Sequence, residues 1–339
     1  MEYRPLGRTG TAVSTLCLGA MTFGKESDEK LSHAQLDRFV ERGGNFIDTA
    51  DVYSQGISEE IIGRWLAARP GVRDQLVLAT KGRFPMGVGP NDHGLSRTHL
   101  TRALEASLHR LGVEAIDLYQ AHAWDPITPI EETLRFYDDA VRDGKIRYAG
   151  VSNFIGWQLQ KAATLTELRE LTPIVTLQPQ YNLITRDIEF ELADVCRNEG
   201  IGILPWSPLA GGWLTGKYRR DEVPTGSSRL GEDPERGMEA YAPRNAQERT
   251  WRIVDTVRQV AEGRGVSMAQ VALAWVADRP QVTSVILGAR TLEQLDDNLG
   301  AAGLHLSESE TARLDEASAP AVADYPYGGP GVEQRSRRF

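Results

Sequence analysis

Residues 75–81 read Gln-Leu-Val-Leu-Ala-Thr-Lys, an apolar run that ends in a lysine. Short runs of this kind, rich in β-branched residues, recur along the chain, and the segments between them have helical periodicity. Such an alternation predicts parallel strands joined by crossover helices. The eight runs cover residues 15–18, 45–48, 75–80, 115–120, 146–151, 174–178, 201–205 and 283–287.

The spacing of these runs indicates the kind of sheet. The first seven follow one another at roughly thirty residues, the length of a strand, a helix and two loops, which favours a (β/α)8 repeat over an open sheet. We therefore expect an α/β protein with a TIM-barrel fold. The expected helices cover residues 28–43, 58–68, 96–111, 129–143, 156–169, 187–199 and 267–278.

Several segments lie outside the regular repeat. The first dozen residues predict a hairpin that closes the bottom of the barrel, and residues 208–250 predict a long loop after the seventh strand. Additional helices are expected at 247–262 and after the Ser307 cap. We interpret residues 1–318 as a single domain and 319–339 as an extended or partly disordered tail. The sequence does not fix the conformation of the tail or of residues 219–246.

Composition excludes several function classes. The chain is 41% hydrophobic and 25% charged, and its net charge of -9 opposes nonspecific binding to nucleic acid or to anionic membranes. No apolar run is long enough to span a bilayer, and the first residues have no signal-peptide core. Cys17 and Cys196 are not at ligand spacing, so we expect two reduced, buried thiols, no metal site and a cytoplasmic protein.

Four polar residues follow the ends of predicted strands: Asp48, Tyr53, Lys81 and His122. In a barrel of parallel strands this is the face where substrates bind, so the placement favours catalysis. The chain has only six lysines beside 32 arginines, which suggests that position 81 needs an ammonium of adjustable pKa.

Together these four groups suit carbonyl chemistry. A phenol can donate a proton when a neighbouring ammonium stabilises its phenolate, and a carboxylate can hold that ammonium. Tyr53 would be the acid, and Lys81 would adjust the pKa of Tyr53. Asp48 would hold Lys81 in place, and His122 would orient the carbonyl by donating a hydrogen bond. Singly, each has a plainer interpretation: a capping carboxylate, a packed aromatic, an ion-pair partner and a core histidine.

The residues around these positions resemble the aldo-keto reductase superfamily, in the branch with bacterial stress-type reductases and potassium-channel β subunits. The motifs are Asp48-Thr49-Ala50-Asp51-Val52-Tyr53 with Ser58-Glu59-Glu60, Ala79-Thr80-Lys81, Asp117-Leu118-Tyr119-Gln120-Ala121-His122 and Gly150-Val151-Ser152-Asn153-Phe154. The likeness runs from Leu6 to about Leu314. It implies a (β/α)8 barrel that reduces aldehydes or ketones with NADPH, and it gives the four polar residues the roles described above.

A cofactor site is expected at the loops after the last two strands, because no G-x-G-x-x-G pattern follows a strand and barrels commonly hold phosphate at these loops. By the resemblance, Trp206 stacks on the nicotinamide while Ser152, Asn153 and Gln178 bind its carboxamide. The residues expected to follow the pyrophosphate are Ser207, Leu209, Gly211 and Lys217.

The far end of the nucleotide is assigned by the same resemblance. Gly288-Ala289-Arg290 leads into a predicted helix, and Arg290 matches the position near the adenosine phosphate, which favours NADPH/NADP+ over the unphosphorylated cofactor. Gln294 and Asn298 lie on one face of that helix, where a solvated face is the plainer interpretation. Asp297 is the expected acceptor of the adenine amine, and Arg229 is a second candidate for phosphate or adenine.

Substrate choice is the least determined property. Phe23 and Trp124 are expected to form an apolar wall that suits a small-molecule carbonyl substrate. Two alternatives to a reductase stay open: a nucleotide-sensing binding subunit that acts through a partner protein, and a sugar or alcohol dehydrogenase working in the oxidative direction. The sequence does not decide the physiological substrate, the direction or the oligomeric state.

Overall fold

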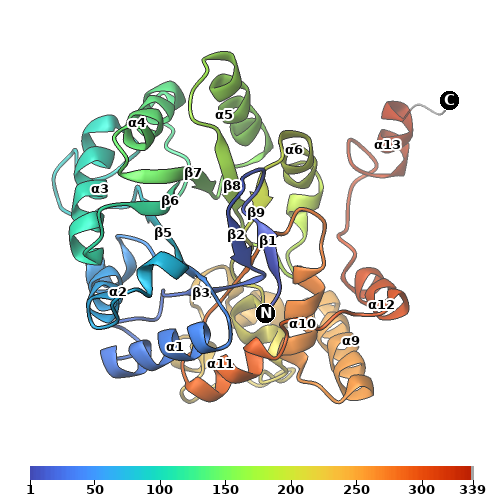
Figure 1. Ribbon diagram of the computed structural model, residues 1–339. Coiled ribbons are helices and arrows are strands. Elements are labelled where there is room, and N and C mark those ends of the chain that lie inside the picture. Colours follow the sequence, from blue (N-terminus) through green and yellow to red (C-terminus); the bar gives the residue numbers. More distant parts are fainter. Residues whose placement is uncertain (337–339) are drawn as a thin grey trace.

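A computed structural model describes residues 1–336 as a barrel of parallel strands inside a ring of helices (Figure 1). The strands are β3 (Leu16–Gly19), β4 (Phe46–Asp48), β5 (Val77–Gly82), β6 (Ile116–Ala121), β7 (Ile146–Ser152), β8 (Ile174–Gln178), β9 (Gly202–Ile203) and β10 (Val285–Leu287). They pair in parallel in the order β10-β3-β4-β5-β6-β7-β8-β9. Each strand overlaps one of the predicted runs, so the expected (β/α)8 fold is confirmed.

The barrel closes between β9 and the chain leading into β10. The Thr283 N–H donates to the Ile203 carbonyl at 2.9 Å, and the Ile286 N–H donates to the Pro205 carbonyl at 2.9 Å. These bonds join the two edges of the sheet, so all eight carboxyl ends meet at one mouth.

Helices follow the strands as predicted, usually within two residues of the expected bounds. They are α1 (Glu29–Glu41), α2 (Ile57–Ala67), α3 (Arg97–Leu111), α4 (Ile130–Arg142), α5 (Gly156–Leu168), α6 (Leu192–Glu199), α10 (Met268–Ala277) and α11 (Leu292–Leu299), with short 3₁₀ turns η2 (Arg73–Gln75) and η3 (Asp187–Glu189). Local chemistry sets their ends: the Ser96 side chain caps α3, and Gly112 ends it at φ 63°. The helix expected over 187–199 is divided into η3 and α6.

The N-terminal hairpin plugs the bottom of the barrel, as the sequence analysis expected. Strands β1 (Tyr3–Pro5) and β2 (Ala12–Ser14) are antiparallel. Leu6 and Val13 are fully buried and pack against inward-facing strand residues such as Phe46 and Val175. Gly7 adopts φ 56° so close to the barrel that a Cβ there would lie 2.2 Å from the Val175 carbonyl oxygen.

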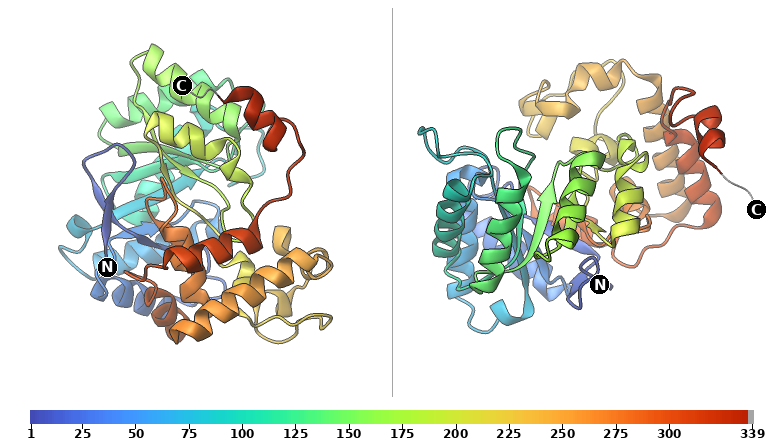
Figure 2. Two further views of the ribbon diagram at one scale, coloured as in Figure 1. Left: turned by 90° about the vertical axis from the view of Figure 1, so that its right-hand side faces the viewer. Right: turned by 90° about the horizontal axis from the view of Figure 1, so that it is seen from above.

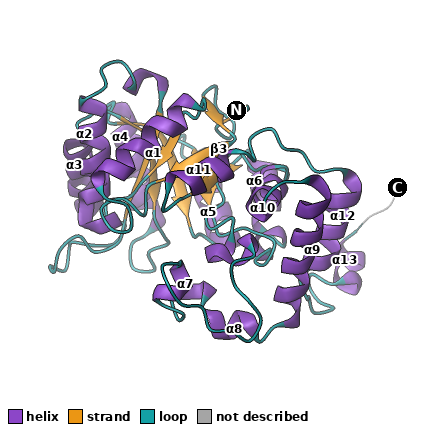
Figure 3. Cartoon of the chain, turned by 90° about the horizontal axis from the view of Figure 1, so that it is seen from below, coloured by secondary structure: helices purple, strands orange, loops and turns teal. Residues whose placement is uncertain are grey.

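The long loop after β9 has a hydrophobic core of its own. It contains η4 (Ala210–Thr215), α7 (Arg229–Glu232), η5 (Gly237–Glu239) and α8 (Tyr241–Asn245), and it leads into α9 (Glu248–Arg264) (Figure 3). Trp213 is buried and stacks on Tyr241 at 5.5 Å between ring centroids, with Trp251 edge-on at 5.6 Å. Aromatic packing therefore orders a segment whose sequence has no regular period.

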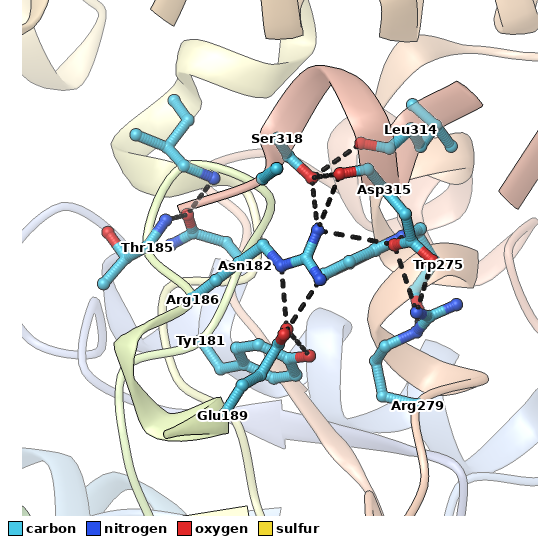
Figure 4. Close-up of polar contacts among 12 residues, drawn as sticks. Tyr181, Asn182, Thr185, Arg186, Glu189, Trp275, Arg279, Leu314, Asp315 and Ser318 are labelled. Atoms are coloured by element: carbon cyan, nitrogen blue, oxygen red, sulfur yellow. Dashed lines mark hydrogen bonds and ion pairs between the residues drawn. The ribbon is translucent and has the colours of Figure 1, made fainter. Parts of the chain in front are cut away.

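Helix α12 (Glu308–Ser318) is fastened to the barrel by a polar network (Figure 4). Arg186, almost buried, donates to the Ser318 hydroxyl at 2.8 Å, to the Asp315 carbonyl at 3.1 Å and to Glu189 at 2.8 Å. The Trp275 indole N–H donates to the Asp315 carboxylate at 2.9 Å. The loop after β8, α10 and α12 thus form one unit.

The tail beyond α12 is not extended throughout. It contains helix α13 (Gly329–Arg335), and Tyr327 stacks on Phe190 beside α6 at 5.1 Å, so the segment runs along the outside of the barrel (Figure 2). Among residues 1–336, no helix is both long enough and apolar enough to cross a membrane.

Candidate active site at the carboxyl ends of the strands

The structure brings Asp48, Tyr53 and Lys81 together at the mouth of the barrel. Asp48 ends β4, Lys81 lies near the end of β5, and Tyr53 begins the 3₁₀ turn η1 (Tyr53–Gly56). The Lys81 ammonium is fully buried and donates to Asp48 Oδ2 at 2.6 Å, to the Thr49 carbonyl at 2.7 Å and to the Tyr53 hydroxyl at 3.2 Å. All three of its protons have acceptors, so the ammonium is fixed in direction.

The second oxygen of Asp48 is held by two amides. Gln178 donates to Oδ1 at 2.8 Å and Gln120 at 3.2 Å. Our sequence analysis quoted Gln120 in a motif without giving it a role. It lies two residues before His122, and side chains alternate between the faces of a strand, so this spacing is the signal that places both toward the interior.

Tyr53 is set by a strained turn. Ser54 and Gln55 have φ of 50° and 55°, values that side-chain-bearing residues rarely adopt. The Ser54 hydroxyl donates to the Phe23 carbonyl at 2.9 Å and ties the turn to the loop after β3. Strained residues of this kind cluster at functional sites, and here they aim the phenol at Lys81.

His122 completes the constellation from the end of β6. Its ring meets Tyr53 edge-on at 5.8 Å between centroids and Phe84 at 4.7 Å. Its Nδ1 is buried and has no hydrogen-bond partner in the part of the chain that the structure describes. Burial, followed by the charges of Lys81 and Arg83, holds the pKa of this imidazole well below its usual range, so the ring is neutral at neutral pH.

The proton balance of the centre is set mainly by burial. Burial raises the pKa of Tyr53, the Lys81 ammonium lowers it, and the Asp48 carboxylate raises it again. For Lys81, burial lowers the pKa, but Asp48 and Tyr53 more than compensate, so the pKa of the ammonium is raised above its ordinary value. Tyr53 therefore carries its proton, and Lys81 stays charged beside it.

The residues expected at the nicotinamide form a connected set next to this centre. The Ser152 hydroxyl donates to the Gln178 carbonyl at 2.8 Å, the Asn153 amide donates to the His122 carbonyl at 2.9 Å, and the Trp206 N–H donates to Asn153 Oδ1 at 3.1 Å. Asn153 has φ 56°, a further strained residue at this face. The Gln178 side chain, however, donates to Asp48.

The segment expected along the pyrophosphate is organised by a residue that sequence reasoning missed. Glu239, buried in the long loop, accepts from the Ser207 hydroxyl and from Gln180 at 3.1 Å. Ser207 has φ 54° and Gly211 has φ 63°. Leu209 is half-buried beside them. No sequence pattern around Glu239 predicts a contact with the barrel. The contact forms only because the intervening loop folds back in three dimensions.

Three cations lie on the loops after β9 and β10. Partial burial, followed by the charges of Arg290 and Arg229, lowers the pKa of Lys217, so the three cations act on one another. Arg229 Nε is buried and lacks a hydrogen-bond partner among residues 1–336. A cluster of like charges with an unpaired donor is suited to a polyanion.

Arg290 itself is held by carboxylates. It pairs with Glu232 at 2.8 Å and with Glu26 at 3.4 Å, and it donates to the Ser227 carbonyl at 2.7 Å. These contacts join the loop after β10 to the long loop and to the loop after β3. The expected phosphate ligand therefore has competing partners that the sequence did not reveal.

The two residues expected on one face of the helix after Arg290 differ in burial. Gln294 is exposed and accepts from the Arg290 N–H at 2.9 Å, whereas Asn298 is buried and donates to the Gly288 carbonyl at 3.3 Å. Asp297 accepts from Ser267 at 2.8 Å and from Gln270.

The two expected substrate residues differ in position. Phe23 is fully buried and packs in the main hydrophobic core, which favours a packing role. Trp124 is half-buried at the rim, edge-on to Phe154 and to the exposed Trp157, each at 5.2 Å.

Comparison with known proteins identifies the family of the chain. Residues 15–319 match the model of the Aldo/keto reductase family. The chain belongs to the aldo/keto reductase family. It is 38% identical to the uncharacterized oxidoreductase YrpG of Bacillus subtilis, over 98% of both chains. It is also 38% identical to a probable voltage-gated potassium channel subunit beta of Arabidopsis thaliana, over 89% of this chain and 91% of the relative.

A further relative of this aldo/keto reductase has a named substrate. The norsolorinic acid reductase of Aspergillus flavus is 33% identical over 91% of this chain and 78% of the relative. The family membership inferred from the sequence motifs is thus confirmed, and relatives named as oxidoreductases or reductases occur in a bacterium and a fungus.

Proposed function

We propose that this protein reduces aldehydes or ketones to alcohols with NADPH, and that Tyr53 is the proton donor. The observation that carries the proposal is the contact of the buried Lys81 ammonium with both the Tyr53 hydroxyl, at 3.2 Å, and Asp48, at 2.6 Å. A phenol beside a fixed ammonium loses its proton more easily as charge develops on a substrate oxygen, since the phenolate that remains is stabilised.

The protein's own groups divide the work. Tyr53 gives its proton to the carbonyl oxygen, Lys81 stabilises the phenolate, and Asp48, held by Gln120 and Gln178, keeps Lys81 in place. His122 is neutral, so it would donate a hydrogen bond to the same oxygen without competing for the proton. When bound, the nicotinamide supplies the hydride.

The residues present fit a phosphorylated dinucleotide. Trp206 and Asn153 would hold the nicotinamide end, and the cluster of Lys217, Arg229 and Arg290 would hold the phosphates. The unpaired, buried Nε of Arg229 supports an anionic ligand at that end. Buried free thiols at Cys17 and Cys196 agree with a reducing compartment such as the cytoplasm.

A direct test is a panel of short aldehydes, ketones and aldoses followed by the absorbance of NADPH. Consumption of NADPH with at least one carbonyl class, and its loss in Tyr53→Phe, is the expected result. Turnover in Tyr53→Phe comparable to that of the unaltered protein would remove Tyr53 as the acid.

A second candidate is a nucleotide-sensing binding subunit that acts through a partner protein. The similarity to a probable channel subunit beta favours it. It predicts tight NADPH binding with a turnover that stays slow for every carbonyl in the panel, so the same measurement separates the two.

A further inference from the structure

Asp51 is a buried carboxyl group that the proposed chemistry leaves unused. It follows β4 by three residues, and its backbone N–H donates to the Lys81 carbonyl at 3.1 Å. Its side chain is fully buried, and neither carboxylate oxygen has a hydrogen-bond partner within the described chain. Buried polar groups normally have hydrogen-bond partners, so a buried carboxyl group without them is unusual.

The cations around Asp51 are already engaged. Lys81 is bound to Asp48, and Arg110 of α3 is bound to the fully buried Glu59 of α2 at 2.7 Å. Tyr119 of β6 has an unpartnered hydroxyl within residues 1–336, and both its hydroxyl and Asp51 Oδ2 border Gly82, where a Cβ would lie 2.3 Å and 3.5 Å from them. The charged and titratable groups facing Asp51 are thus Tyr53, Glu59, Lys81, Arg110 and Tyr119, with Asp92, His99 and Arg102 across an adjoining cavity.

That cavity connects Asp51 to the outside of the barrel. It has a volume of about 220 Å³, lies between the loop after β5 and helix α3, and reaches from the exposed Arg102 to Asp51. Arg102 is paired with Asp92 at 3.6 Å, so the wall carries little net charge. Apolar atoms form most of its lining, but its volume has room for several water molecules beside the polar side chains of Asp92, His99 and Arg102, one wall away from the Asp51 carboxyl group.

The same surroundings bring the charge of Asp51 into the neutral range. Burial and the Glu59 carboxylate raise the pKa of Asp51 to about 7, against the smaller opposing effects of the Val52 backbone N–H, Arg110 and Lys81. Asp51 in turn contributes to raising the pKa of Tyr53. The charges of Asp51 and Tyr53 are therefore coupled, although Asp51 is the smallest of the effects on Tyr53.

We propose that Asp51 is a positioning residue that exchanges a proton with water through this cavity, and that its charge sets how readily Tyr53 releases its own proton. With Asp51 protonated, the Lys81 ammonium acts on Tyr53 without a further opposing charge. With Asp51 ionised, the added negative charge holds the Tyr53 proton more tightly, and reduction slows. This inference rests on the function proposed above.

The test compares the unaltered protein with Asp51→Asn over pH 6 to 8.5. Asparagine has nearly the shape of the protonated carboxyl group and cannot ionise. We expect the ratio of kcat for Asp51→Asn to kcat for the unaltered protein to rise about three- to tenfold across this range, with little change in KM. Asp92→Asn is the matched control, since it lines the same cavity and should leave that ratio flat. A flat ratio for Asp51→Asn as well would overturn the proposal.

A second variant keeps the test decisive if Asp51→Asn does not fold. Glu59→Gln removes the negative charge nearest to Asp51, so the pH at which the rate declines should move down; an unmoved midpoint contradicts the proposal. The pH dependence of the unfolding temperature reports the ionisation of Asp51 without any substrate. If no carbonyl is reduced, the proposed function and this role fall together. If reduction occurs but Asp51 does not titrate, only this inference fails.

Discussion

The buried centre of this protein and the outer loops around Arg290 both depend on ion pairs, yet the two are built differently. At the centre, the side chains of Lys81 and Asp48 are 0% and 3% exposed, and every proton of the ammonium has an acceptor. In the outer loops, the side chains of Arg290 and Glu232 are 19% and 47% exposed. Water screens the second pair and not the first, so the centre is fixed while the outer pair can exchange partners.

The largest difference should appear in turnover. Tyr53→Phe removes the proton donor while leaving the ring and its surroundings, so kcat should fall by about 10²- to 10⁴-fold. NADPH affinity, measured by fluorescence titration, should change little. Tyr148→Phe is the control, because its hydroxyl contacts Thr11 at the bottom of the barrel. A comparable loss in both variants would mean that Tyr53 has no special role.

Breaking the buried pair should also cost stability. Lys81→Met leaves the Asp48 carboxylate buried without its cation, and we expect the free energy of unfolding in urea to fall by about 3–5 kcal/mol. Adding Asp48→Asn should recover part of the loss, since the stranded charge is then gone. Arg220→Met, which breaks an exposed pair with Glu248, serves as the surface counterpart and should have a much smaller effect. Equal losses would contradict the contrast between the two regions.

Asp51 gives the centre a pH-dependent stability. Because its pKa is raised from 3.8 to about 7 in the folded state, it adds no penalty when protonated in both states and an increasing one as pH rises toward 7, to a total of about 4 kcal/mol. Asp51→Asn removes this penalty. Urea unfolding should therefore show a gain over the unaltered protein that is about 2–3 kcal/mol larger at pH 8 than at pH 5. A gain that does not depend on pH would show that Asp51 titrates normally.

In the outer loops, the effect of a substitution should depend on the cofactor. On the proposed phosphate assignment, Arg290→Ala would remove charge-assisted bonds to the additional phosphate of NADPH, so the Kd for NADPH should rise about 10- to 100-fold, and that for NADH far less. The fold itself should be little affected, as unfolding curves will show. Equal losses for both cofactors would refute the phosphate assignment.

The smallest effect is expected for Glu232→Gln. This variant tests whether Arg290 can exchange Glu232 for another anionic partner. On the proposed phosphate assignment this carboxylate, paired with Arg290, would compete with the cofactor, so its removal should tighten NADPH binding about two- to fivefold while leaving NADH binding unchanged. Raising the ionic strength should reduce the difference between variant and unaltered protein. Weaker NADPH binding would indicate that Glu232 holds Arg290 in its binding position.

The sequence by itself determined the barrel and the positions of most candidate catalytic residues. Period and spacing located all eight strands and the helices around them, because each element is short and its pattern is local. The same reasoning placed Asp48, Lys81 and His122 at strand ends, and the parallel sheet then forces them to one mouth. It also located the loops that carry Trp206 and Arg290.

Only the tertiary structure decided what surrounds these residues. Glu239 reaches Ser207 from a loop 32 positions away, and Glu232 and Glu26 reach Arg290 across 58 and 264 positions. In the sequence, Asp51 is an ordinary acidic residue of a motif. Only the structure shows that its carboxylate oxygens lack hydrogen-bond partners among the described residues. Hydrophobic periodicity indicates which face of an element is buried, but it does not indicate which distant polar groups contact that face. The pKa of a buried charged group depends on those contacts.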